Sequence, residues 1–522
     1  MAIAYRADGK GLRFLASAGD WLADADTSDR LTELKNALGA RTGWRLEVAE
    51  GDEVERYDAA GKLRTITARN GLTLTLAYSE GAAGLEGGYV LGPDGVPTST
   101  VLPAGLLLRV EDPFGRALTY GYGADMRVSR VTDADSGVYR FAYDGQHRLV
   151  SVKFPDGKLR VYHYNEPAHT GGIQQTLALT GITDENGQRH ATYKYNAQGR
   201  AVSTENGQGA NRYTLVYNAD GSSSVTDPLG TTRIYGFHNA LGALKNSAIG
   251  GPACPSCGPA SQSFDANGNV SSKLDWNGNR TDFVYDLARN LETSRTEGLT
   301  AAGAATPQVR TITTAWHSVF RLRARIAEPL RITTNVYDVD GLQCGARGAL
   351  CSQSVQATSD TDGSQGFGAT PLGEPRTRSF TYDRNGSVLT IDGPRDDVQD
   401  LTVYSYYPND DADLGKRGNV ATITNAVGHT TTFTAYNAHG QHLVFVDANG
   451  LETTLSYDAR QRLTSRTVGG ETTSYDYDGV GQLTRVTLPD GSSVSYSYDA
   501  AHRMTGMQDN LGNRIAYDLD PM

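Results

Sequence analysis

A tyrosine followed by an acid or its amide recurs at a nearly constant spacing over residues 436–518. The spacings are 21, 20, 21 and 19 residues, and the tyrosines are Tyr436, Tyr457, Tyr477, Tyr498 and Tyr517. The residues that follow them are Asn437, Asp458, Asp478, Asp499 and Asp518. A fixed period with a constant two-residue signature indicates a repeat architecture, in which each unit is one supersecondary element.

The unit from Tyr477 to Tyr498 has the pattern of a β-hairpin. Asp478 and Gly481 are three residues apart, which suits a tight turn with aspartate first and glycine fourth. A strand is expected over 483–488, a second turn over 489–491, and a second strand over 493–498, where valine and tyrosine alternate with serine. Because a lone hairpin is barely stable in water, we expect an all-β fold in which the hairpins pair edge to edge as one long antiparallel sheet.

Composition and charge agree with this fold and exclude some partners. The chain has 60 glycines, and its 28 tyrosines far outnumber its 12 phenylalanines. The net charge is −11, and the sequence has no basic stripe that could neutralise phosphates, so we expect no nucleic-acid partner. No apolar run is long enough for a transmembrane helix, and the N-terminus lacks the apolar core of a signal peptide. Both ends of the chain have the pattern of interrupted repeats, which predicts a fragment or a truncated gene product.

The repeat varies along the chain, and we expect one continuous repeat domain with five segments. Leu31, Leu34 and Leu38 in the first segment fit either a short helix or a loop. The segments are irregular N-terminal β repeats over 1–78, a loop excursion over 79–106, a YD-repeat β sheet over 107–295, loop-rich insertions with Cys344 and Cys351 over 296–375, and a regular YD-repeat β sheet over 376–522.

Some turns lack the glycine of the repeat. His147, Gln461 and His502 stand at the position that Gly481 occupies in its unit. A non-glycine residue in the left-handed conformation costs ~1 kcal/mol. We therefore expect these three turns to adopt another geometry.

The cysteines are the candidate metal or redox residues of the chain. Cys254 and Cys257 have two residues between them, and Cys344 and Cys351 have six. Three interpretations stay open: two local disulfides, free thiols, or one zinc site built from all four cysteines. No cofactor is expected.

No pattern typical of a catalytic site is present, so the chain is expected not to be an enzyme. The nucleophile elbow, the zinc-protease helix and the phosphate-binding lysine loop are all missing from the sequence. The stretches 338–341 and 360–363 resemble the start of calcium loops, but they lack the closing glutamate, and ordinary hairpin turns explain them. The tyrosine rows have two interpretations, cross-strand packing within the sheet or binding of sugars.

The motif Tyr-Asp-x-x-Gly-x-Leu, as in 477–483, followed by a second Asp/Gly turn, resembles the YD-repeat or rearrangement-hotspot (Rhs) family. This family is related to the shell of toxin-complex C components and to teneurins. The resemblance covers the whole chain and is strongest over 376–518. It implies a sheet that spirals into a hollow shell, here an incomplete one, which encloses a C-terminal toxin domain until a bacterial delivery machinery exports it.

The sequence departs from this family in two ways. The core segment with its cleavage motif and the toxin domain are both missing, as is the segment that attaches to the delivery machinery. The resemblance therefore implies the shell role only, with no catalytic residue. The expected partners are a toxin domain and the delivery machinery, and the expected location is the bacterial cytoplasm and then the extracellular space. The alternative hypothesis is a secreted or surface adhesive protein that binds carbohydrates.

Overall fold

The computed structural model describes residues 1–83 and 88–522. Within these ranges the fold is all-β, as the repeat pattern predicts, with one 42-stranded sheet and a separate two-stranded sheet formed by β9 and β10. The first part of the chain contains β1 (Ala2–Tyr5), β2 (Gly11–Ser17), β3 (Asp20–Ala23), β4 (Arg30–Lys35), β5 (Arg41–Val48), β6 (Glu53–Asp58), β7 (Leu63–Thr67), β8 (Thr73–Tyr78), β9 (Tyr89–Leu91), β10 (Pro97–Val101), β11 (Leu107–Glu111), β12 (Ala117–Tyr122), β13 (Val128–Thr132), β14 (Val138–Tyr143), β15 (Leu149–Lys153) and β16 (Leu159–Tyr164).

The middle of the chain contains η1 (Pro167–His169), β17 (Leu179–Thr183), β18 (Arg189–Tyr195), β19 (Ala201–Asn206), η2 (Gly207–Gly209), β20 (Tyr213–Tyr217), β21 (Ser223–Thr226), β22 (Thr232–Ala240), β23 (Ala243–Gly250), η3 (Pro255–Cys257), β24 (Ser261–Phe264), β25 (Val270–Leu274), β26 (Arg280–Asp286), β27 (Leu291–Leu299), β28 (Ala305–Trp316), β29 (Arg323–Glu328), β30 (Arg331–Tyr337) and β31 (Leu350–Thr358).

The last part contains η4 (Gly366–Gly368), β32 (Pro371–Tyr382), β33 (Val388–Asp392), β34 (Thr402–Tyr406), β35 (Val420–Thr424), β36 (Thr430–Tyr436), β37 (His442–Val446), β38 (Glu452–Tyr457), β39 (Leu463–Val468), β40 (Glu471–Tyr477), β41 (Leu483–Thr487), β42 (Ser493–Tyr498), β43 (Met504–Asp509) and β44 (Arg514–Ala516). Among the described residues, no helix is long and apolar enough to span a membrane.

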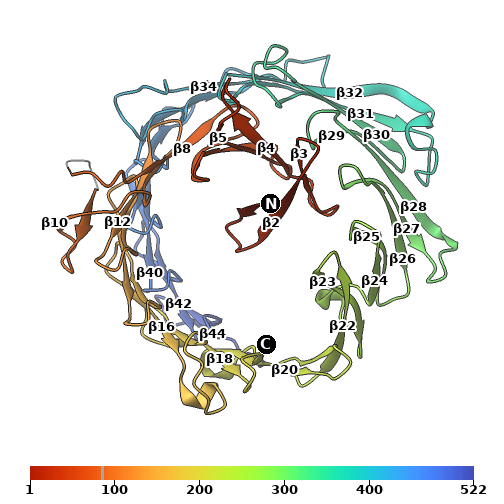
Figure 1. Cartoon of the computed structure of the whole chain (residues 1–522). Helices are drawn as coiled ribbons and strands as arrows, with labels where there is room; N and C mark the ends of the chain where they lie inside the picture. Colours follow the sequence, from red (N-terminus) through yellow and green to blue (C-terminus); the bar gives the residue numbers. More distant parts are fainter. Residues whose placement is uncertain (84–87) are drawn as a thin grey trace. The chain divides into compact units, whose positions relative to one another are not determined.

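Consecutive strands pair with one another, so the sheet follows the order of the sequence. Strands β40, β41, β42 and β43 form successive antiparallel pairs, in which Val486 lies opposite both Tyr475 and Val494. Figure 1 shows the same arrangement for β26, β27 and β28, which lie side by side. Each pair needs only a short turn, because antiparallel neighbours reverse direction within a few residues.

The chain divides into two compact units, each assembled from segments that are far apart in the sequence. Unit 1 contains residues 1–76, 234–405 and 423–429, and unit 2 contains residues 77–233, 406–422 and 430–522. Each unit is described by itself below.

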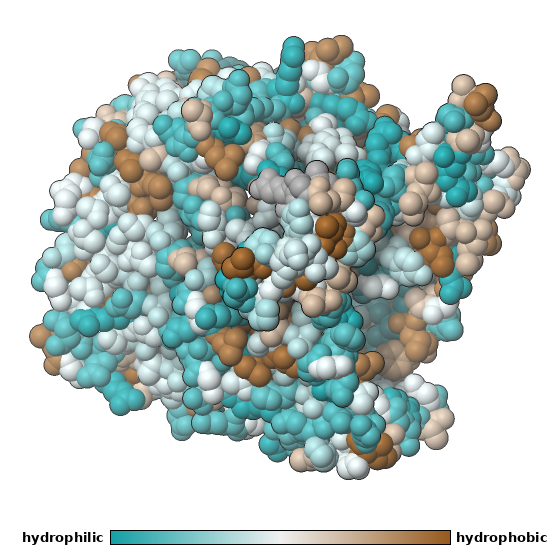
Figure 2. Space-filling view, turned by 60° about the vertical axis from the view of Figure 1, so that its left-hand side comes forward, coloured by the Kyte–Doolittle hydropathy of each residue, from teal (hydrophilic) through white to brown (hydrophobic). Residues whose placement is uncertain are grey.

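Small apolar clusters take the place of one large core. In unit 1, Phe14 and Leu46 are fully buried, and Trp21 packs beside them in a T-shaped contact with Trp44 at 5.1 Å between ring centroids. In unit 2, the buried side chains of Leu102 and Tyr122 form another cluster with Val90. Figure 2 shows one face of the molecule, on which hydrophobic residues are scattered in small groups among hydrophilic ones.

One sequence expectation about local structure is wrong. The stretch that contains Leu31 and Leu34 is neither a helix nor a loop but strand β4, because the turn at 36–39 brings it back against β5, with Leu31 opposite Leu46. The segment 296–375 contains strands, including β28 and β31, as well as the loops 338–349 and 359–370.

The segment 79–106 lies outside the large sheet, since β8 pairs directly with β11. It carries the two-stranded sheet of β9 and β10, with Pro97 opposite Leu91. Residues 84–87, which belong to the same expected excursion, lie outside the described residues.

Candidate functional site

The repeated aspartate holds each turn through its carboxylate. Oδ1 of Asp478 accepts hydrogen bonds from the backbone N–H groups of Val480, Gly481 and Gln482 at 3.1, 2.9 and 2.8 Å. Gly481 has a φ of +102°, which is the left-handed region that favours glycine. The aspartate therefore fixes the turn from which β41 starts.

An arginine four residues after the aspartate completes several turns. Nε of Arg462 donates to Oδ2 of Asp458 at 2.6 Å, and Nε of Arg503 donates to Oδ2 of Asp499 at 2.9 Å. The guanidinium of Arg462 also lies 5.1 Å from the ring centroid of Tyr477, so one side chain contacts two successive repeats. The pKa of Asp458 lies below its usual value because hydrogen bonds to the backbone and to Arg462 outweigh the opposing effect of burial.

The turns without glycine keep the same geometry, so the expectation of another geometry is wrong. His147, Gln461 and His502 have φ values of +63°, +66° and +66°. Their backbone N–H groups donate to the carbonyl oxygens of Asp144, Asp458 and Asp499, respectively, as the glycine does in its unit. The aspartate bonds and the strand pairing on both sides fix the turn strongly enough to offset a strain of ~1 kcal/mol.

The signature tyrosine connects each repeat to the repeat before it by a hydrogen bond. The hydroxyl of Tyr498 donates to the carbonyl oxygen of Leu483 at 2.8 Å, and that of Tyr477 donates to Leu463 at 3.0 Å. In both cases the acceptor is the first residue of the strand that follows the previous turn. The same bond is made by Tyr122, Tyr143, Tyr164, Tyr195, Tyr217, Tyr337, Tyr382, Tyr436 and Tyr457.

These bonds explain the tyrosine rows as part of the sheet. Burial raises the pKa of Tyr436 to about 12, with a smaller contribution from the neighbouring Tyr407. Burial also raises the pKa of Tyr477 and Tyr498. Since the hydroxyls already donate to the backbone, the arrangement favours the packing interpretation of the rows.

The last signature pair differs from the others. Tyr517 is 42% exposed, and the stretch 518–522 forms no turn or strand.

The cysteines are joined as two local pairs. Cys254 is bonded to Cys257, and Cys344 is bonded to Cys351. A four-cysteine zinc site would need the same sulfur atoms as free thiolates. The structure thus has the first of the three arrangements considered, two local disulfides.

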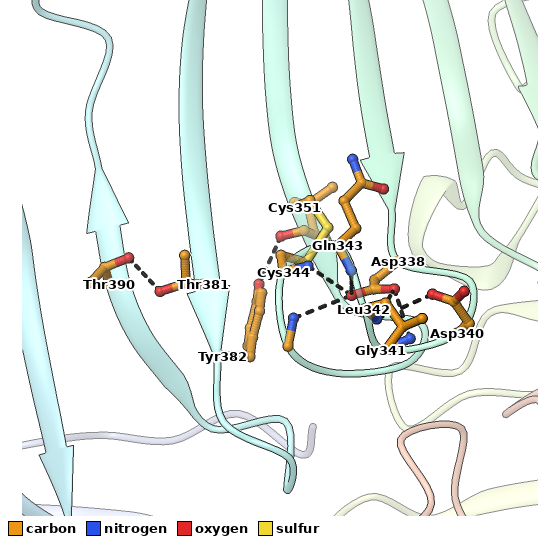
Figure 3. The surroundings of a disulfide bond; sticks show 12 residues. Asp338, Asp340, Gly341, Leu342, Gln343, Cys344, Cys351, Thr381, Tyr382 and Thr390 are labelled. Atoms are coloured by element: carbon orange, nitrogen blue, oxygen red, sulfur yellow. Dashed lines mark hydrogen bonds between the residues drawn. A yellow bond between two sulfur atoms is a disulfide. The ribbon is translucent and has the colours of Figure 1, made fainter.

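The second disulfide joins Cys344, in the loop 338–349, to Cys351 in β31, and the same loop surrounds a buried carboxylate (Figure 3). Asp338 is fully buried, and its carboxylate accepts backbone N–H groups of the residues 341–345 at 2.7–3.2 Å. Burial opposes ionisation, but the N–H groups of Cys344 and its neighbours outweigh it and lower the pKa of Asp338. The loop is therefore neither an ordinary hairpin turn nor a calcium loop, because its carboxylate oxygens are already bonded to the backbone.

In unit 2, turns that are about 300 residues apart in the sequence contact one another. Oδ1 of Asn186 accepts the backbone N–H of Gly479 at 2.8 Å, and its Nδ2 donates to Asp478 at 2.9 Å. The fully buried side chain of Glu185 is paired with Arg160 at 3.0 Å and with Arg460 at 3.2 Å. Two cations on one buried carboxylate offset the cost of removing it from water.

A cluster of Asp184, His190 and His502 lies in the same contact region. Nε2 of His502 is 2.8 Å from Oδ2 of the buried Asp184, and the rings of His190 and His502 are stacked at 4.0 Å. Burial, followed by the nearby His502, lowers the pKa of His190. These three side chains are one of the groups in the described residues that could hold a metal ion.

A similar contact region in unit 1 surrounds an open cavity of about 320 Å³. Both carboxylate oxygens of Asp52 accept the backbone N–H of Arg321 at 3.1 Å, and Asp52 also pairs with Arg69 at 3.0 Å. Asn290 donates to the carbonyl oxygen of Ala25 at 2.8 Å. Turns of the first 76 residues are thus joined to turns that follow residue 234.

Sequence reasoning found the tyrosines and aspartates but missed their partners. The arginine at the fourth position after the aspartate, as in Arg462 and Arg503, could have been found from its recurrence in the repeats. No sequence signal identifies Asn186, Glu185 or Asp184 as contact residues, because their partners lie in distant repeats.

Comparison with known proteins identifies the repeats. The family model for the RHS repeat matches residues 124–159, 436–473 and 477–514. These three stretches are therefore RHS repeats, which confirms the YD-repeat (Rhs) resemblance. The double-stranded DNA deaminase toxin A of Burkholderia cenocepacia (strain H111) is 30% identical to this chain over 151 residues, which are 28% of this chain and 9% of that protein.

Solved structures show where the same fold occurs. The crystal structure of TcdB2-TccC3 without the hypervariable C-terminal region matches 92% of this chain with a TM-score of 0.51 and 15% identity. That of TcdB2-TccC3-TEV matches 93% with a TM-score of 0.50 and 14% identity. This chain covers 24% and 27% of those two chains and under a tenth of the deaminase toxin, so it corresponds to a part of each.

Proposed function

We propose that the chain is a segment of an RHS-repeat shell that encloses a toxin polypeptide before its delivery, and that it performs no chemistry of its own. The observation that carries the proposal is the continuous antiparallel repeat sheet, whose fold is shared with TcdB2-TccC3. The similarity to a deaminase toxin over 151 residues supports an association with toxins. The partners would be a toxin domain and a bacterial delivery machinery, and the complete particle would be made in the cytoplasm and then exported.

The contacts between distant turns support a container role. If each hairpin paired only with its neighbours in the sequence, repeats that are hundreds of residues apart would have no contact with one another. The hydrogen bond between Asn186 and Gly479 and the ion pair between Arg460 and the buried Glu185 provide such connections within unit 2. A wall that must keep a cargo away from proteases requires contacts of this kind.

Protection of a cargo tests the proposal. A small protease-sensitive reporter domain is fused after Met522, and its cleavage by a nonspecific protease is compared with that of the free reporter. We expect cleavage to slow at least tenfold in the fusion. The control is the same fusion with Gly479→Ala, which should lose protection because the turn contact is disturbed. Equal cleavage of the free and fused reporter would contradict the proposal.

A further inference from the structure

The cluster of Asp184, His190 and His502 contains the ligand types that a divalent transition metal prefers. Imidazole nitrogens and a carboxylate oxygen are typical ligands of zinc. One atom from each residue lies within 4.8 Å of the others. On a tetrahedral zinc ion, such atoms would be ~3.4 Å apart. The distance of 2.8 Å between Nε2 of His502 and Oδ2 of Asp184 is shorter than this, so these two groups would move slightly apart around an ion.

One nitrogen of the cluster has no partner among the described residues. Nδ1 of His190 is shielded from solvent and makes no hydrogen bond there. A buried polar atom of this kind calls for a partner that is not a protein group, such as a water molecule or an ion.

Backbone hydrogen bonds fix the position of the carboxylate in the cluster. Asp184 is held by the backbone N–H groups of Asn186 and Gln188, which donate to its Oδ1 at 3.0 and 2.9 Å. Its Oδ2 faces Nε2 of His502 at 2.8 Å, and an ion bound by both atoms would take the place of the hydrogen in that contact. The positive charge of Arg160 near His190 opposes a cation, whereas Asp184 favours it.

We propose that Asp184, His190 and His502 bind a divalent transition-metal ion of the zinc type. The ion would connect the turn 184–187 to the turn 499–502 across more than 300 residues of sequence. This inference depends on the geometry of unit 2 alone and stands whether or not the chain encloses a toxin.

Titration calorimetry with zinc chloride tests the site, using the oxidised chain after dialysis against a chelator. We expect one saturable site per chain in the wild type. His190→Gln and His502→Gln should each weaken the affinity at least tenfold. The matched control is His439→Gln. His439 also faces a carboxylate, Asp133 at 3.6 Å, and its buried Nε2 makes no hydrogen bond among the described residues, yet it lies outside the cluster.

Two outcomes would overturn the proposal. One is the absence of saturable zinc binding to the wild-type chain, and the other is unchanged binding by folded His190→Gln and His502→Gln variants. If either variant fails to fold, X-ray absorption of the zinc-loaded wild type decides. Scattering from two imidazole rings around zinc supports the site, and a shell without imidazole contradicts it.

Discussion

Asn186 and Gly479 are 293 residues apart in the sequence, yet the side-chain oxygen of Asn186 accepts the backbone N–H of Gly479 at 2.8 Å. Gly479 has no side chain to hold the two turns apart. A Cβ atom at this position would lie 2.6 Å from the carbonyl oxygen of Glu185 and 2.7 Å from Oδ1 of Asn186. The absence of a side chain is thus what lets the two turns meet.

The first prediction follows from this close approach. Gly479→Ala should lower the free energy of unfolding by ~1–3 kcal/mol, because overpacking forces the backbone of the turns to shift. Chemical denaturation monitored by circular dichroism measures the change. The matched control is Gly145→Ala, at the same position of another Tyr-Asp turn, where a Cβ would meet nothing within 4 Å. Equal effects of the two substitutions would exclude turn-to-turn packing as the cause.

The second prediction concerns the tyrosine hydroxyl. Tyr436 is 9% exposed and donates to the carbonyl oxygen of Val420 at 2.6 Å. Tyr436→Phe should cost ~1–3 kcal/mol, because the carbonyl oxygen of Val420 loses the hydrogen bond from a buried side chain while the ring packing stays. Thermal unfolding measures the change, and Tyr5→Phe, at a side chain that is 75% exposed, is the neutral control. An unchanged stability of Tyr436→Phe would mean that the hydroxyl is not needed.

The third prediction concerns the buried carboxylate of Asp338. Asp338→Asn should destabilise the chain by ~2–4 kcal/mol at pH 7, since charge-assisted hydrogen bonds to a buried group are lost. Because the pKa of Asp338 is lowered on folding, its contribution is full above the usual carboxyl pKa and is lost as pH falls through the folded value. The difference between variant and wild type should therefore shrink in acid.

Asp340→Asn is the control for that loop. Asp340 is exposed and accepts only the N–H of Leu342, at 3.1 Å, among the hydrogen bonds of the described residues. Its substitution should change the stability by less than ~0.5 kcal/mol. If Asp340→Asn lowered the stability more than Asp338→Asn does, the buried carboxylate of Asp338 would not be the group that holds the loop.

The fourth prediction concerns pH and His317 in unit 1. Nδ1 of His317 accepts the backbone N–H groups of Val319 and Phe320 at 3.1 Å, and protonation would remove both bonds. Burial, then the charge of Arg289, lowers the pKa of His317, against an opposing effect of Asp52. The unfolded chain therefore takes up this proton at a higher pH than the folded chain does.

Stability should consequently rise with pH across the window just below the usual histidine pKa, where the unfolded state binds more protons. Urea unfolding at a series of pH values measures this slope. His317→Gln should flatten it, while the exposed His429→Gln should leave it as in the wild type. A slope that is unaffected by His317→Gln would assign the dependence to other groups.

The sequence is sufficient to predict the local unit of the fold but not the contacts between distant units. Tyr477, Asp478 and Gly481 predict the hairpin because turn chemistry and alternation act within a few residues. The strand at Leu31 was missed because its leucines lack alternation and only pairing with β5 decides its conformation. Asn186 and Gly479 could not be matched from one sequence, because neither carries a signal that specifies a partner 293 residues away.

Electron microscopy of the purified chain tests the central claim most directly. A shell segment should appear as a curved, hollow particle in negative stain, with stain filling its interior. The Gly479→Ala variant should show fewer or more open particles at the same protein concentration. A straight, solid rod would contradict the shell role of this chain.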